Sequence, residues 1–136
     1  MMGFESTDFG KLMLRLAIAI IMFPHGLHKV LNGHEEIKAI LSKNGLPEFL
    51  WVGVPCAEFI APILLVLGLW VRPAAVLIAA TMLMSIYLVY RTSLVSLNQF
   101  GGIAYELNLL LVLTSLALFF LGSGKYGISR GQGLLQ

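Results

Sequence analysis

The chain has 136 residues, of which 58% are hydrophobic and 12% are charged. Soluble domains are about half apolar and about one-quarter charged, so this composition and a mean hydropathy of +0.88 exclude an ordinary soluble protein. The net charge is only +2 and the cations are spread along the chain, which leaves no surface for nucleic acid. The remaining class is an integral membrane protein, with the lipid bilayer as its partner.

Most of the chain lies in four long apolar segments, at about 9–30, 49–69, 73–90 and 103–121. Each is close to the roughly 20 residues that a helix needs to cross about 30 Å of hydrocarbon. The runs are continuous and lack the alternation of barrel strands, so helices are the only economical structure in lipid. The sequence therefore predicts an all-α integral membrane four-helix bundle, built as a single transmembrane domain over 1–136.

The segments between these spans are short. Residues 32–47 place Ile37, Ile40 and Leu41 at helical spacing among charged residues, which predicts a short interfacial helix between the first two spans. Residues 91–102 are predicted to form a polar hairpin, and the glycine-rich C-terminal tail is not expected to be helical.

Four crossings put both termini on one side of the membrane. The cations of that side are Lys11, Arg15, Arg72, Lys125 and Arg130, and those of the other side are Lys29, Lys38, Lys43 and Arg91. Glutamates accompany the second group, so the positive-inside rule places both termini in the cytoplasm.

Five ionisable residues lie within or at the end of the spans. A charge at bilayer depth costs roughly 2.5–3.5 kcal/mol, so each one requires a partner. Arg15 lies about 9 Å into the first span, counted from residue 9, and is predicted to belong to a structural ion pair. Glu58, Glu106, His25 and Lys29 all approach from the side opposite the termini.

Helical spacing also favours a common location for several of these residues. His25, His28 and Lys29 are related by three and four residues, so they can share one helix face. Prolines precede His25 and stand on both sides of Glu58, where they remove backbone hydrogen bonds and permit kinks. The pattern predicts a small polar cavity near one membrane face, with His25 within side-chain reach of Glu58 or Glu106.

The order of these polar positions also resembles a known family. The stretches "RLAIAIIMFPHGLHKVLNG", "PCAEFIAPILLVLGLWVRPAA" and "AYELNLLLVLTSLALFFLGSGKYGIS" are similar to the DoxX family of small four-helix membrane proteins. The positions that carry the likeness are Arg15, His25, Gly26, Lys29, Glu58, Glu106, Asn108, Gly122, Gly124 and Tyr126. The resemblance implies a four-helix bundle in the bacterial inner membrane. It also implies a link to membrane redox chemistry, since relatives include a small subunit of a thiosulfate:quinone oxidoreductase and partners of oxidative-stress enzymes.

Two functions of different class follow. In the first, His25, Lys29, Glu58, Glu106 and Asn108 line a pocket for a quinone head group or a similar small molecule. The histidine and the lysine would bind a carbonyl oxygen, and a carboxylate would carry the proton that accompanies electron transfer. In the second, the protein anchors or assembles a soluble redox enzyme through the 32–47 segment and the 91–102 loop, on the side of the membrane opposite the termini. A transport role, a purely structural ion-pair network and a homo-oligomer stay open.

Several cofactors are disfavoured. A single cysteine, Cys56, cannot form an internal disulfide relay. Haem is disfavoured because His25 and His28 lie on one helix and cannot clamp an iron from both faces. A metal on these histidines and two carboxylates is chemically open, but Lys29 would neutralise the site and argues against it. No metal is predicted, and quinone is the one cofactor retained.

Overall fold

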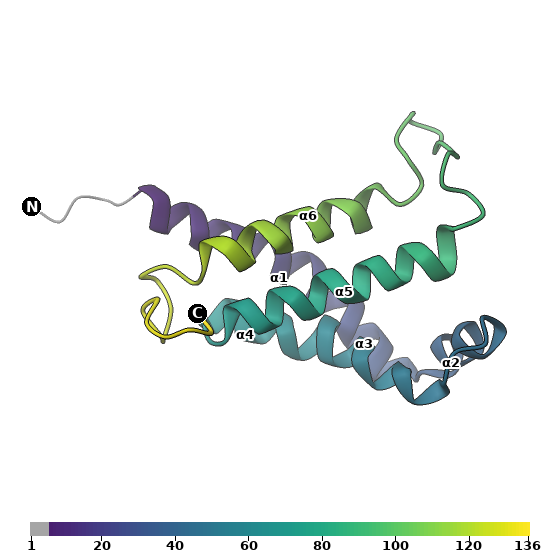
Figure 1. The fold of residues 1–136 in the computed structure, drawn as a ribbon, viewed down its shortest axis with the longest axis horizontal. Helices are drawn as coiled ribbons and strands as arrows, with labels where there is room; N and C mark the ends of the chain where they lie inside the picture. The colour runs from purple at the N-terminus through teal and green to yellow at the C-terminus, as the bar shows by residue number, and fades with distance from the viewer. Residues whose placement is uncertain (1–5) are drawn as a thin grey trace, which may run out of the picture.

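The computed structural model describes residues 6–136, and its regular structure is helical (Figure 1). The elements are α1 (Ser6–Asn32), α2 (Glu35–Lys43), the 3-10 helix η1 (Glu48–Val52), α3 (Gly53–Pro55), the π-helix η2 (Cys56–Ile60), α4 (Ala61–Leu67), α5 (Val71–Tyr90) and α6 (Glu106–Leu121). The predicted all-α membrane bundle is confirmed. The first five residues of the predicted domain lie outside the described residues.

Within residues 6–136, three helical segments have the length and composition to cross a membrane: Ser6–Asn32, Glu48–Leu67 and Val71–Tyr90. The fourth, α6, has 16 residues and is also apolar, which gives about 24 Å at 1.5 Å per residue. It begins three residues later than the predicted span, because Ile103 pairs with Leu97 in an isolated antiparallel bridge and is held in the preceding loop.

The second span changes its hydrogen-bonding pattern where Glu58 lies. The five residues of η2 form a π-helical turn, a feature that often marks functional positions. Pro62 has no N–H to donate to the carbonyl oxygen of Glu58 four residues earlier, so the regular α-helical bond is missing there. α1 crosses this turn at Gly26, where a methyl group would overlap that same carbonyl group.

The core of the bundle combines branched side chains with small ones. Ile18, Leu65, Ile78 and Leu118 are almost fully buried, and alanines of α4 and α5 pack beside them. Small residues let membrane helices approach closely, which supplies packing contacts where lipid offers no hydrophobic driving force.

The predicted interfacial helix is present as α2, and it lies across one end of the bundle (Figure 1). Its face toward the protein carries Leu41, which is buried. At its start the ring of His34 stacks on Trp51 with centroids 4.2 Å apart, and the Lys38 ammonium lies 5.5 Å from the same indole ring. These contacts dock α2 on η1.

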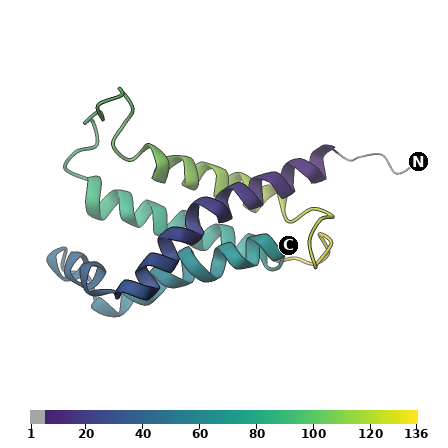
Figure 2. The same ribbon diagram turned by 180° about the vertical axis from the view of Figure 1, so that it is seen from behind.

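The beginning of α1 and the C-terminal tail lie at the other end of the bundle, seen from both sides in Figures 1 and 2. As predicted, the tail contains no helix over 122–136. It is nevertheless ordered against the turn after α4, since the Ile128 N–H donates to the Leu67 carbonyl and the Ser129 hydroxyl donates to Gly68 at 2.7 Å.

Candidate functional site

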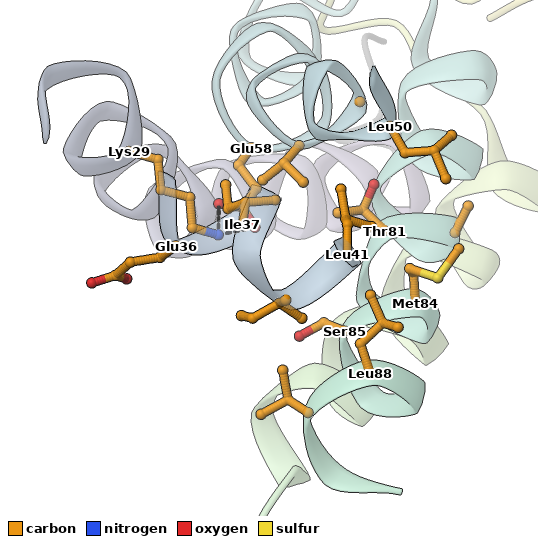
Figure 3. Close-up of a pocket in the computed structure, with 15 residues that line it drawn as sticks. Lys29, Glu36, Ile37, Leu41, Leu50, Glu58, Thr81, Met84, Ser85 and Leu88 are labelled. Carbon is orange, nitrogen blue, oxygen red and sulfur yellow. Dashed lines mark hydrogen bonds and ion pairs between the residues drawn. The ribbon is translucent and has the colours of Figure 1, made fainter. Parts of the chain in front are cut away.

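A cavity of about 330 Å³ lies beneath α2, between this helix, the second span and α5 (Figure 3). Its apolar lining comes from Ile37, Ile40 and Leu41 of α2, Leu50 of η1, and Met84 and Leu88 of α5. Mostly apolar cavities of this size with a few polar groups are typical of small-molecule sites.

The charged residues of this cavity are an ion pair, Lys29 and Glu58, and a second carboxylate, Glu36 of α2 (Figure 3). The Lys29 ammonium donates to Glu58 Oε1 at 2.7 Å and lies 2.6 Å from Oε2, although Oε2 has no directed hydrogen bond of its own. The carboxylate side chain is 5% exposed and the lysine side chain 34%. Lys29 therefore reaches from the edge of the bundle to a carboxylate held in its interior.

The helix positions explain why the pair forms. Met22 and Gly26 belong to the buried stripe of α1, and Lys29 continues that stripe at the next turn. Because Gly26 brings α1 against the backbone of η2, the long lysine side chain needs to span only one turn to reach Glu58. The prolines of α3 and α4, on either side of η2, determine the local backbone, and the glycine determines the distance between the helices.

Two hydroxyl groups of α5, those of Thr81 and Ser85, belong to residues that also line the cavity. The Asn108 amide of α6 donates to Ser85 Oγ at 3.2 Å and to Met82 Sδ at 3.6 Å. Asn108 thus approaches the cavity only through Ser85. Thr81 and Ser85 do not appear among the sequence candidates, although their four-residue spacing in an apolar helix was a signal that could have found them.

His25 does not line the cavity. Its side chain is exposed, and ring Nδ1 lies 2.9 Å from the Ile21 carbonyl oxygen of its own helix. Although His25 and Lys29 lie on neighbouring positions of one face, His25 is farther from the centre of the buried stripe and its shorter side chain is occupied locally. The structure brings together Lys29 and Glu58 but leaves the histidine at the flank.

Glu106 also lies apart from the cavity lining. It is exposed at the first residue of α6, where its Oε1 accepts a hydrogen bond of 3.1 Å from the Asn98 side chain. The side-chain oxygen Oδ1 of Asn98 in turn accepts from the N–H groups of Phe100 and Gly102. The sequence predicted a span from about residue 103, which places Glu106 one turn inside the helix. Because α6 begins at Glu106, this carboxylate instead organises the loop before the helix.

Arg15 is fully buried at the opposite end of the bundle. Its predicted carboxylate partner is replaced in the structure by backbone carbonyl oxygens, those of Leu65, Val66, Ser123 and Tyr126. The last carbonyls of a helix lack intrahelical donors, and a guanidinium carries five N–H groups, so the end of α4 and the tail together satisfy the arginine.

Within residues 6–136, no group of three or more histidine, cysteine or acidic side chains comes close enough to hold a metal ion. His25 and Glu106 lie apart from the cavity that Glu58 lines, so these three side chains do not meet. Cys56 is a free, partly buried thiol at the start of η2.

Comparison with known proteins identifies the family. The DoxX family model matches residues 10–91, which is more than half of the chain and includes Lys29, Glu58 and the α5 wall of the cavity. The fourth helix, with Glu106 and Asn108, lies outside the matched range. Comparisons with curated proteins and with solved structures found no match.

Proposed function

The chain belongs to the DoxX family of membrane proteins, and on this premise we propose that its cavity binds a quinone head group or a similarly small molecule with polar oxygens. The observation that carries the proposal is the Lys29–Glu58 pair in the wall of a mostly apolar cavity. The aliphatic side chains and Met84 suit the faces of a ring, and the pair supplies polar contacts at one edge.

The two charged groups have different roles in this proposal. The Lys29 ammonium donates a hydrogen bond to a carbonyl oxygen of the ligand. The Glu58 carboxylate, which is buried and paired with Lys29, accepts or supplies a proton. Reduction of a quinone to a quinol consumes two electrons and two protons. A redox enzyme that associates with this protein supplies the electrons, and Glu58 delivers the two protons one after the other, taking each from water.

The same pair also fits a structural role. Removing one partner of a buried ion pair leaves an uncompensated charge and destabilises the fold, whereas replacing both partners with apolar residues is often neutral. The test therefore uses the double variant Lys29→Met/Glu58→Met. Its matched control is Lys43→Met/Glu48→Met, which removes one cation and one carboxylate from exposed positions outside the cavity lining.

The measurement is binding of a short-chain ubiquinone to the purified protein in nanodiscs. We expect the Lys29→Met/Glu58→Met variant to unfold at a temperature close to that of the wild type and to bind the quinone at least about tenfold more weakly, the loss of about 1.4 kcal/mol. The control should bind like the wild type. Equal quinone binding by all three proteins, or none by the wild type, would contradict the proposal.

A second function is favoured by the loop at the α2 end of the bundle. Val95 and Phe100 are 92% and 88% exposed there, which suits either the membrane surface or the surface of a bound enzyme. We propose as the alternative that the protein anchors a soluble redox enzyme through this loop and α2. Mass spectrometry after gentle purification distinguishes the two functions, because a stoichiometric enzyme without quinone supports the anchor. Loss of that enzyme in a Val95→Ser/Phe100→Ser variant would identify the contact.

A further inference from the structure

A second, polar cavity of about 400 Å³ lies at the end of the bundle that carries the tail, far from α2. Four cations line it: Lys11 of α1, Arg72 in the first turn of α5, and Lys125 and Arg130 of the tail. Among residues 6–136, Asp8 is the one carboxylate side chain in the lining, and it lies 3.6 Å from the Lys11 ammonium. This basic cavity therefore carries a clear excess of positive charge.

Arg72 has hydrogen-bond donors that the described protein does not use. Its Nε is buried without a partner among residues 6–136, and Nη1 makes a long contact of 3.4 Å with the Leu134 carbonyl oxygen. A buried N–H without a partner is costly. Guanidinium groups bind phosphate oxygens through paired N–H groups, so an anion in this cavity would satisfy the arginine.

The backbone of the tail presents a second cation in an unusual conformation. Arg130 has a φ of 51°, in the left-handed region that favours glycine, and Gly131 and Gly133 follow it with positive φ values. An arginine at such a position retains backbone strain, although the tail is otherwise rich in glycine. Strain of this kind often accompanies function. Gly124 closes the cavity on the α1 side, since a Cβ atom there would lie 3.0 Å from the Asp8 carboxylate.

We infer that the basic cavity binds a phosphate group, supplied either by the head group of an anionic lipid or by free phosphate. The position of the cavity at the end of membrane helices suits a lipid, because basic pockets between such helices bind anionic head groups. Arg72 and Arg130 bind the phosphate oxygens. The site lies at the opposite end from the proposed quinone cavity, and the inference is independent of that function.

The test uses the full chain in a neutral detergent, with native mass spectrometry to count bound phosphatidylglycerol against phosphatidylcholine. A parallel thermal-unfolding series contains inorganic phosphate and no lipid. We expect selective retention of phosphatidylglycerol and at least about tenfold weaker retention by the Arg72→Gln/Arg130→Gln variant, since each cation near the membrane surface contributes roughly a fivefold factor. The control, Lys43→Gln/Arg91→Gln, makes the same change of charge at the α2 end and should retain the lipid.

A single variant separates binding from folding. Arg130→Gly removes a cation at a position whose φ suits glycine, so the protein should unfold at the same or a higher temperature while it retains less phosphatidylglycerol. Stabilisation by inorganic phosphate without lipid selectivity assigns the site to free phosphate. Absence of both responses in the wild type, or wild-type lipid retention by Arg130→Gly and the double variant, would overturn the inference.

Discussion

Arg15 joins three separate parts of the chain through one guanidinium group. It belongs to α1, and its carbonyl partners include Leu65 at the end of α4 and Tyr126 in the tail, at 2.8 and 2.7 Å. An arginine inside a membrane helix is expensive unless its donors are satisfied. Here it fixes an otherwise irregular tail beneath the helices.

Replacing Arg15 with alanine should strongly destabilise the protein. The change leaves several buried carbonyl groups without donors, and we expect a loss of about 3 kcal/mol or more in the free energy of unfolding. Arg15→Lys should retain only part of the free energy of unfolding that Arg15→Ala loses, because an ammonium has three donors and lacks the planar fork of a guanidinium. Thermal unfolding in detergent measures the effect, with Lys43→Ala on the exposed face of α2 as the control. Equal melting temperatures for Arg15→Ala and the control would show that the carbonyl contacts contribute little.

At the scale of elements, the crossing of α1 and η2 determines the shape of the candidate site. Gly26 leaves no side chain between the two backbones, and Phe23 stacks on Phe59 beside it with ring centroids 5.3 Å apart. The crossing positions Lys29 one turn later against Glu58. A small change in helix separation would therefore change both the packing and the ion pair.

Gly26→Ala tests this crossing, and Gly10→Ala on the same helix is its matched control. The first methyl group meets the carbonyl group of Glu58, whereas nothing lies within 4 Å of the second. We expect Gly26→Ala to destabilise the protein by about 1–3 kcal/mol through overpacking, and Gly10→Ala to stabilise it by roughly 0.5–1 kcal/mol through helix propensity. Thermal unfolding compares the two. Similar shifts for both variants would mean that the helices separate without cost.

At the scale of the whole molecule, the bundle has two chemically different ends. One carries α2, the 91–105 loop and the Lys29–Glu58 cavity, and the other carries the start of α1, the tail and the basic cavity. The greater share of cations at the second end favours a cytoplasmic position for both termini.

Cysteine labelling in intact cells tests this arrangement. In a Cys56→Ser background, Thr7→Cys and Gln132→Cys report on the two ends of the chain, and Lys43→Cys reports on α2; all three positions are exposed. A membrane-impermeant maleimide should label the α2 site in intact cells and the other two only after lysis. Opposite labelling of residues 7 and 132 would contradict an even number of crossings, and labelling of both in intact cells would reverse the proposed orientation.

Some residues of the candidate site were predicted from the sequence and others were not. The cost of buried charge drew attention to Arg15, Lys29 and Glu58, and all three have partners within the bundle. His25 and Glu106 met the same criterion of depth but lie away from the cavity lining, because depth along a helix does not specify rotation about its axis or where the helix starts. Thr81 and Ser85 carry no charge and give only a weak signal of this kind.

Composition and segment length by themselves determined the membrane class, the approximate spans and the short helix α2, since these depend on local hydrophobicity and its period. The tertiary structure decided which groups the polar side chains of the spans contact. The carbonyl groups around Arg15 come from residues 50 to 111 positions away. Those of α4 meet the guanidinium when α1 packs on α4, and those of the tail only when the tail folds back against α4. The cavity likewise exists only because α2 packs over the second span and α5, a contact that depends on three surfaces and not on the pattern of any single segment.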